Sequence, residues 1–358
     1  DPDAIVNGIG MMLKNAQRQG SLRPTPMALA EPPAHEGALH FPGKIKPIVG
    51  ARGTREWAVA SGGQHQIVIL DEQGQTVQRI GSGKPGFEDG PLASAEFNSP
   101  QGLVAGDGAV FYVADTGNHA LRQVDLASGI VTTLAGSGFR GQPLTGRRYG
   151  EAVDLASPWD LERQENRLFF ANAGTHQIGI YHLGDGLVEV LAGTGEENIV
   201  DGPAGKALLA QPSGLALDPQ GRGLYFTDSE TSALRVVWLD GDPHVETLIG
   251  SGLFDFGDRD GDCKSAALQH PLGVAWHQDG LLVADSYNHR IKQVNLGCRS
   301  VIAFPKGGEA GKSPPLLTPS EPAGIASRCA KTILLSDTNN HRILEYRLDT
   351  GTRRVFAA

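Results

Sequence analysis

The chain has 358 residues, enough to bury a substantial core in one to three domains. Apolar residues make up 40% and charged residues 20% of it, which excludes the disordered, fibrous and membrane classes. The net charge of −9 argues against nucleic acid or an anionic lipid surface as the main partner, because both need clustered Lys and Arg.

The first forty residues differ from the rest. Residues 4–20 place apolar side chains at helical spacing, which predicts a short helix with Ile5, Ile9, Met12 and Leu13 among its apolar positions. The prolines that follow predict an extended linker: Pro24, Pro26, Pro32 and Pro33. We therefore divide the chain into a tail, residues 1–39, and a folded domain, residues 40–358.

Two markers recur in phase through the folded domain. The first is a histidine that ends segments such as VADTGNH, and it falls at His65, His119, His176, His289 and His341, with Ser232 in its place once. The second is a proline, found at Pro42, Pro100, Pro158, Pro212, Pro271 and Pro322. Copies of the first marker lie 52 to 57 residues apart, so six repeats fill the chain from about residue 40 to its end.

Each repeat is predicted to hold four short strands. In the second repeat they are residues 102–105, 110–115, 120–125 and 131–136, rich in apolar and β-branched residues and separated by Gly, Asn and Asp. One such unit cannot bury both of its faces, but six packed radially can. The predicted fold is therefore an all-β, six-bladed β-propeller of four-stranded blades, preceded by a short helix and a linker.

Ring closure follows from the same frame. The last blade is expected to take its outer strand from residues 352–357, and the first blade its own from residues 76–80. No strand would then be exchanged between them, so apolar packing between blades one and six would close the ring. The tail is expected to help by covering that seam.

The residues that repeat suit structural roles better than chemical ones. Asp115, Asp228, Asp285 and Asp337 end the second strands, where a carboxylate can accept hydrogen bonds from the next backbone amides. The histidines could be metal ligands or proton shuttles. Their repetition favours a side chain packed in a turn with a ring nitrogen bonded to backbone.

Few features suggest a metal or a cofactor. An Asp-Gly pair recurs before three of the prolines, and GDRDGD at residues 257–262 resembles the start of a calcium loop but lacks its closing glutamate. Cys263, Cys298 and Cys329 are scattered, so neither a zinc knuckle nor a dithiol centre is expected. We assign no catalytic or metal-binding residue and expect no cofactor, with calcium at the connector as the alternative.

The segments VADTGNH, VADSYNH and SDTNNH closely resemble the NHL repeat, over about residues 40 to 358. Blade three departs most, with Asn172 at the turn and Trp159-Asp160 after its proline. The FPGK segment at Phe41, after a helix and a polar stretch, is similar to proteins in which a thioredoxin-like domain precedes NHL repeats. That resemblance implies that the tail ends a missing thioredoxin-like domain, which would hold any redox activity.

The expected function is a non-enzymatic protein-binding scaffold. The turns and connectors on one face carry histidines and acidic residues, which suit a protein partner or an attached thioredoxin-like domain. The candidate contact residues are Trp159, Asp160, His119, His176, Tyr287, His289 and His341. Replacing Trp159 and Asp160 by Ala and Gly is expected to abolish capture of the partner without lowering stability.

Two other functions are weaker alternatives. A metal-dependent propeller hydrolase or lyase needs ligands from several inner strands, but the residues after the prolines are Gly43, Gln101, Trp159, Ser213, Leu272 and Ala323. RNA binding is opposed by the acidic connectors, because the basic patch of Arg140, Arg147 and Arg148 is small. The sequence predicts no membrane association, and its compartment is expected to be cytoplasmic.

Overall fold

The computed structural model describes residues 2–22, 37–304 and 317–358. The chain divides into two units, residues 1–36 and residues 37–358. In the first unit, α1 (Pro2–Arg18) forms where a helix is predicted, and its apolar side chains Ile9, Met12 and Leu13 are exposed. The predicted proline linker, with Pro24, Pro26, Pro32 and Pro33, lies outside the described residues.

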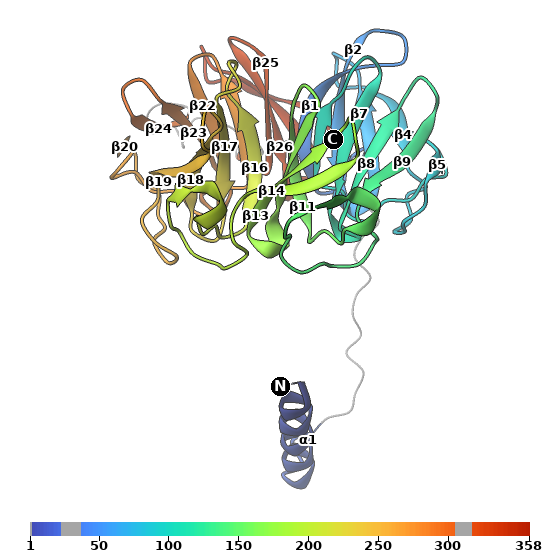
Figure 1. The fold of residues 1–358 in the computed structure, drawn as a ribbon, viewed down its shortest axis with the longest axis vertical. Coiled ribbons are helices and arrows are strands. Elements are labelled where there is room, and N and C mark those ends of the chain that lie inside the picture. The colour runs from blue at the N-terminus through green and yellow to red at the C-terminus, as the bar shows by residue number, and fades with distance from the viewer. Residues whose placement is uncertain (1, 23–36, 305–316) are drawn as a thin grey trace. The chain divides into compact units, whose positions relative to one another are not determined.

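The second unit contains six antiparallel sheets within its described part (Figure 1). The first three consist mainly of β1 (Pro42–Val49), β2 (Arg55–Ser61), β3 (Gln66–Leu70) and β4 (Thr76–Ile80); β6 (Gly102–Ala105), β7 (Val110–Asp115), β8 (Ala120–Asp125) and β9 (Ile130–Ala135); and β11 (Pro158–Gln164), β12 (Arg167–Asn172), β13 (Gln177–His182) and β14 (Leu187–Ala192). The last three consist mainly of β16 (Pro212–Leu217), β17 (Gly223–Asp228), β18 (Ala233–Trp238) and β19 (His244–Ile249); β21 (Gly273–His277), β22 (Gly280–Asp285), β23 (Arg290–Asn295) and β24 (Ser300–Phe304); and β25 (Gly324–Cys329), β26 (Thr332–Asp337), β27 (Arg342–Arg347) and β28 (Arg353–Ala357).

These sheets are the blades of a six-bladed β-propeller, as the repeat predicts. The first strands of successive blades contact one another around a ring, and β25 of the last blade contacts β1 of the first. The strands of blade 2 fall within a residue of their predicted limits. Short 3-10 turns join the second and third strands of five blades: η1 (Gly62–Gln64), η2 (Thr116–Asn118), η4 (Ala173–Thr175), η6 (Ser286–Asn288) and η8 (Thr338–Asn340).

Within residues 37–304 and 317–358, four blades gain a short fifth strand that was not predicted from the sequence. These strands are β5 (Gly90–Pro91), β10 (Arg147–Tyr149), β15 (Gly202–Pro203) and β20 (Gly261–Asp262). They pair with the outer strands β9, β14, β19 and β24. Each belongs to the connector from the preceding blade, so that connector lies along the outer edge of a blade before it enters the centre.

The blade faces are buried against neighbouring blades, which explains the apolar second and third strands. Between blades 1 and 2, for example, Ile67 and Ile69 pack with Phe97 and Phe111, all of them fully buried. At the centre, the inner strands approach so closely that a Cβ added to Gly43 would lie 2.5 Å from the carbonyl oxygen of Gln101. Glycine near the repeated proline therefore permits the backbone contact between inner strands.

The ring closes by packing, as predicted. Blade 1 keeps β4 and blade 6 keeps β28, and no described strand is exchanged between them. Trp57 and Leu70 of blade 1 are buried in one cluster with Leu334 and Phe356 of blade 6. The tail contributes Leu39, which is buried in the same cluster. The N–H of Ala38 also donates to the carbonyl of Ala358 at 2.9 Å, next to that seam.

Candidate functional site

The repeated aspartates anchor the loop that enters the blade in the four blades that have them. In blade 2, the carboxylate of Asp115 accepts the backbone N–H of Asn98 and the side-chain amide of Asn118, both at 2.8 Å. Asp228, Asp285 and Asp337 also accept a backbone N–H from 16 to 18 residues earlier. The donors differ from those expected, because the carboxylates form no capping bond to the turn that follows them.

A buried arginine joins this aspartate to the connector. The guanidinium of Arg122 is fully buried, and it donates to Asp115 at 2.8 Å and to Asp89 at 2.7 Å. Asp89 in turn accepts the backbone N–H and the hydroxyl of Thr133 on β9. Burial raises the pKa of Asp115 to about 6, although the charge of Arg122 opposes that shift. The connector residue Asp89 is therefore largely a structural ion-pair partner.

The same arrangement occurs in blade 4, where Arg235 bridges Asp228 and Asp201 at 2.7 and 3.0 Å. In blade 5 the buried Lys292 instead contacts two connector aspartates, Asp258 and Asp260, at 2.6 and 2.7 Å. This feature was not predicted from the sequence, although the sequence contains a signal for it. A basic residue stands three positions after the repeated His or Ser only in the three blades that also have the Asp-Gly connector. In blade 3 that position is Gly179, where a Cβ would collide with the ring of Phe170.

The repeated histidines link each blade to the next. The ring Nδ1 of His119 accepts the backbone N–H of Ser157 at 3.0 Å, across the boundary between blades 2 and 3. The equivalent bonds at the other boundaries run to His65, His176, His289 and His341, with the hydroxyl of Ser232 accepting at the boundary of blades 4 and 5. The bond from Phe41 to His341 joins blade 1 to blade 6. This one repeated residue thus supplies a hydrogen bond at all six boundaries of the ring.

These bonds predict a pH-dependent contribution to stability. Burial, assisted by nearby Arg140, lowers the pKa of His119, and Nδ1 can accept a hydrogen bond only while it is unprotonated. As the pH falls below about 6.5, the imidazole of His119 takes up a proton in the unfolded chain but resists protonation in the folded propeller. The stability that His119 contributes is therefore present above that pH and is lost below it. His119→Ala, which removes the acceptor, is expected to lose about 1 kcal/mol at neutral pH. In urea unfolding, the difference in the free energy of unfolding between the wild type and this variant should narrow as the pH falls from about 7 to 5.5.

The matched control is His244→Ala, at an exposed position on β19. Both variants keep the buried carboxylates of the wild type. The titration of these carboxylates therefore cancels when each variant is compared with the wild type. A difference that stayed constant with pH would contradict the proposed role of the ring nitrogen of His119.

The centre of the ring is crossed by two ion pairs between blades 1 and 3. Lys44 on β1 lies with its Nζ 3.9 Å from the carboxylate of Asp160 on β11, and these side chains are 4% and 1% exposed. Lys46 and Glu162 form the second pair at 3.0 Å. Burial lowers the pKa of Lys44 to about 8, although Asp160 opposes that shift.

Further bonds tie this central pair to the remaining blades. Lys44 also donates to the carbonyl oxygens of Leu272 and Ala323, which precede β21 and β25. Asp160 accepts the N–H groups of Leu161 and Leu215, both at 2.9 Å. The pair therefore contacts blades 1, 3, 4, 5 and 6, and its polar atoms are engaged in holding the inner strands together.

The sequence offered a signal for this pair that the analysis did not use. The second residue after the repeated proline is glycine in four blades, and only Lys44 and Asp160 replace it. The structure places Asp160 at the centre of the ring with its carboxylate fully engaged, while Trp159 is half-buried beside it. We therefore now expect replacement of Asp160 to lower stability, which revises the expectation stated for the Trp159 and Asp160 variant.

The other predicted contact residues lie in the turns between second and third strands. Tyr287 and His289 are exposed in blade 5, whereas His119 and His176 are half-buried and use Nδ1 in the blade linkage. His341 contacts the ring of Phe41 edge-on, with ring centroids 4.4 Å apart. Of this set, Tyr287 offers a partner an exposed aromatic ring.

A cavity of about 450 Å³ opens beside Tyr287, between blades 4 and 5. Phe254 and Phe256 of the connector line it and are 88% and 63% exposed. His270 and the acidic residues Glu197 and Glu230 also line it. The cavity was not predicted from the sequence, because its walls come from five separate stretches of the chain: residues 197, 229–232, 253–256, 269–270 and 287.

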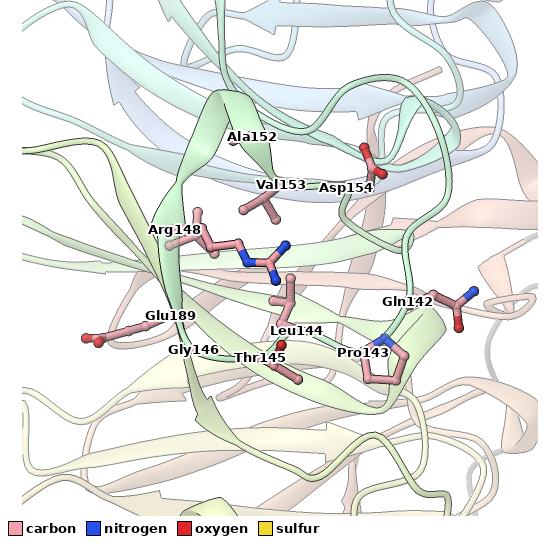
Figure 2. Close-up of a pocket in the computed structure, with 11 residues that line it drawn as sticks. Gln142, Pro143, Leu144, Thr145, Gly146, Arg148, Ala152, Val153, Asp154 and Glu189 are labelled. Atoms are coloured by element: carbon pink, nitrogen blue, oxygen red, sulfur yellow. The ribbon is translucent and has the colours of Figure 1, made fainter.

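A second cavity, of about 320 Å³, lies beside the predicted basic patch. Figure 2 shows Arg148 extending into it between Val153 and Leu144. Arg147 instead pairs with Asp185 at 3.4 Å, and Arg140 donates to the carbonyl of Gly174. The three arginines thus do not converge on one site.

The acidic residues of the segment that resembles a calcium loop are engaged by basic side chains. Asp258 pairs with Arg290 and Lys292, and Asp260 pairs with Lys292. Across residues 2–22, 37–304 and 317–358, no three His, Cys, Asp or Glu side chains are grouped so that they could hold a metal ion. The three cysteines are free thiols. None of the helices in the described part of the chain has the length and apolar character needed to cross a membrane.

Solved structures with a similar fold have varied functions. A streptogramin B lyase structure gives a TM-score of 0.55 at 13% identity, covering 90% of this chain and 85% of that one. A chain of the nidogen/laminin complex gives 0.56 at 16% identity, covering 83% and 92%. A gluconolactonase from Xanthomonas campestris gives 0.53 at 16% identity, covering 83% of each chain. At these identities the likeness defines the class as a six-bladed propeller and nothing finer.

Sequence comparison defines the family. The chain is 38% identical over 352 residues to NHL repeat-containing protein 2 of Bos taurus, covering 89% of this chain and 48% of that protein. It is 37% identical to the human protein of that name, covering 87% and 47%. It is also 37% identical to protein SUPPRESSOR OF QUENCHING 1, chloroplastic, of Arabidopsis thaliana, covering 87% and 31%. No family model matches the chain.

The chain belongs to the NHL-repeat family of β-propellers. It spans about half the length of the NHL repeat-containing proteins that it matches, and about a third of the plant protein.

Proposed function

We propose that this propeller is a binding platform for a protein partner and performs no chemistry of its own. One contrast carries the proposal. The charged side chains at the centre of the ring neutralise one another, in the pairs of Lys44 with Asp160 and of Lys46 with Glu162. The face that carries the turns between second and third strands, called the loop face below, instead exposes aromatic rings beside a cavity.

Exposed aromatic side chains support this proposal on energetic grounds. Phe254, Phe256 and Tyr287 leave apolar surface in water, and a folded protein gains by covering such a patch with a partner. Aromatic residues are also enriched in the energetically important parts of protein interfaces. The resemblance to longer proteins with an additional thioredoxin-like domain makes such a domain one candidate partner.

Site-specific cross-linking tests the proposal. The full chain would carry p-benzoyl-phenylalanine at position 287 on the loop face, or at position 77 on β4 as a control, where Val77 is 43% exposed. After irradiation in an extract of the source organism, we expect a reproducible cross-linked protein from position 287 and none from position 77. Equal cross-linking from both positions would contradict a specific platform.

A direct assay addresses the hydrolase or lyase alternative. The purified chain would be incubated with gluconolactone and with divalent cations, with and without a chelator. We expect no turnover above the uncatalysed rate. Turnover that required the metal and was lost in Asp160→Asn would overturn the proposal in favour of an enzyme that acts at the centre of the ring.

A further inference from the structure

We propose that the cavity between blades 4 and 5 receives a lysine or arginine side chain of the protein partner. This inference rests on the proposed function, because it names the chemistry of the partner that the platform binds. The cavity is called the blade 4/5 pocket below, and its defining residues are Phe254, Phe256, His270, Tyr287, Glu197 and Glu230.

The pocket lies at the one blade boundary where the repeat changes. Elsewhere a histidine ring bridges to the next blade, but here the shorter Ser232 accepts the N–H of His270 at 3.1 Å. The linkage is therefore kept with a smaller side chain, and Ser232 lines the pocket. Serine in place of histidine at this position thus leaves space for the pocket beside the hydrogen bond that links the two blades.

The aromatic walls suit a long basic side chain. The rings of His270 and Tyr287 are stacked face to face, with centroids 4.4 Å apart and planes 19° apart, so each ring keeps only its outer face for a further contact. Phe254 and Phe256 stand on the connector that borders the pocket. A lysine or arginine could place its aliphatic stem against these rings and its cation over a ring face.

The charges of the pocket favour a cation over a neutral or acidic group. Glu197 and Glu230 line it, and none of the lining residues is Lys or Arg. Burial lowers the pKa of His270, so its ring adds no positive charge at neutral pH. The net charge of −9 would also favour the approach of a basic partner surface.

Paired peptides test this inference on the full chain. The probe is a fluorescein-labelled alanine peptide with two arginines, and its matched partner has citrulline in place of both, which keeps the shape and removes the charge. By fluorescence anisotropy we expect the arginine peptide to bind about tenfold more tightly. Equal affinity for the two peptides would overturn the inference, because the pocket would then select only apolar contact.

Two variants locate the binding. Phe254→Ser with Phe256→Ser removes the aromatic contact, and Glu197→Gln with Glu230→Gln removes the charge while keeping size. Each pair is expected to weaken binding of the arginine peptide about fivefold or more. The matched controls are Phe139→Ser, at an exposed position on the connector between blades 2 and 3, and Glu151→Gln, also exposed. They should change affinity less than about twofold, and an equal loss in the controls would show non-specific attraction and overturn the inference.

These outcomes separate the inference from the proposed function. A protein captured through position 287 that still binds the Phe254→Ser, Phe256→Ser variant with full affinity would leave the platform standing and refute the pocket. Selective binding of the arginine peptide without any captured protein would support the pocket and count against the platform.

Discussion

Replacing Arg122 by Met is expected to lower the free energy of unfolding by about 3–5 kcal/mol, the usual result of removing one member of a buried ion pair. Asp115 would remain fully buried with only the N–H of Asn98 and the amide of Asn118 as donors. The variant would also lose the bonds from the guanidinium to two connector carbonyls, those of Glu88 and Glu96. Urea denaturation followed by tryptophan fluorescence measures the change.

Two comparisons sharpen this experiment. Arg147→Met removes a half-exposed pair with Asp185 and should cost no more than about 1 kcal/mol. The pKa of Asp115, already raised to about 6, should rise further without Arg122, so lowering the pH from about 8 to 6 should relieve part of the loss. A loss in Arg122→Met no larger than in Arg147→Met would contradict the structural role of Arg122.

Replacing Asp160 by Asn is expected to have the second large effect. The change keeps the shape of the side chain but leaves Lys44 buried without a counter-charge, and it should cost about 3 kcal/mol or more at neutral pH. Lys44→Met should also destabilise, since it leaves the carboxylate unpaired. The double variant should lose less than the sum of the single losses, because it leaves no unpaired charge in the ring. Urea denaturation of the four proteins measures the coupling.

The pH dependence provides an independent readout. The pKa of Lys44, lowered to about 8, lies below its value in the unfolded chain, so this group makes stability rise with pH between about 8 and 10. In Asp160→Asn the pKa of Lys44 should fall further. The loss in the free energy of unfolding relative to the wild type should therefore shrink as the pH rises from about 7 to 9. Additive losses with no pH dependence would show that the two side chains are not coupled across the ring.

Much of this protein follows from sequence because the fold is a repeat. Six phased prolines and the His or Ser marker predicted the number of blades, and apolar and β-branched residues predicted the strands. The frame also predicted closure without strand exchange, because the first and last blades each supply four strands. These features depend on local sequence, because one repeat of about 50 residues contains the residues that form the strands and turns of one blade.

The sequence by itself therefore determined the propeller, its blade boundaries and the repeated turn residues. The tertiary structure decided which distant residues meet: Lys44 with Asp160 across the ring, Arg122 with Asp89, and the aromatic walls of the blade 4/5 pocket. The physical reason is that side-chain pairing at the centre and on the loop face depends on how the closed ring places separate blades. A periodic pattern reports which positions are equivalent, whereas contacts between non-equivalent positions arise only after the ring has closed.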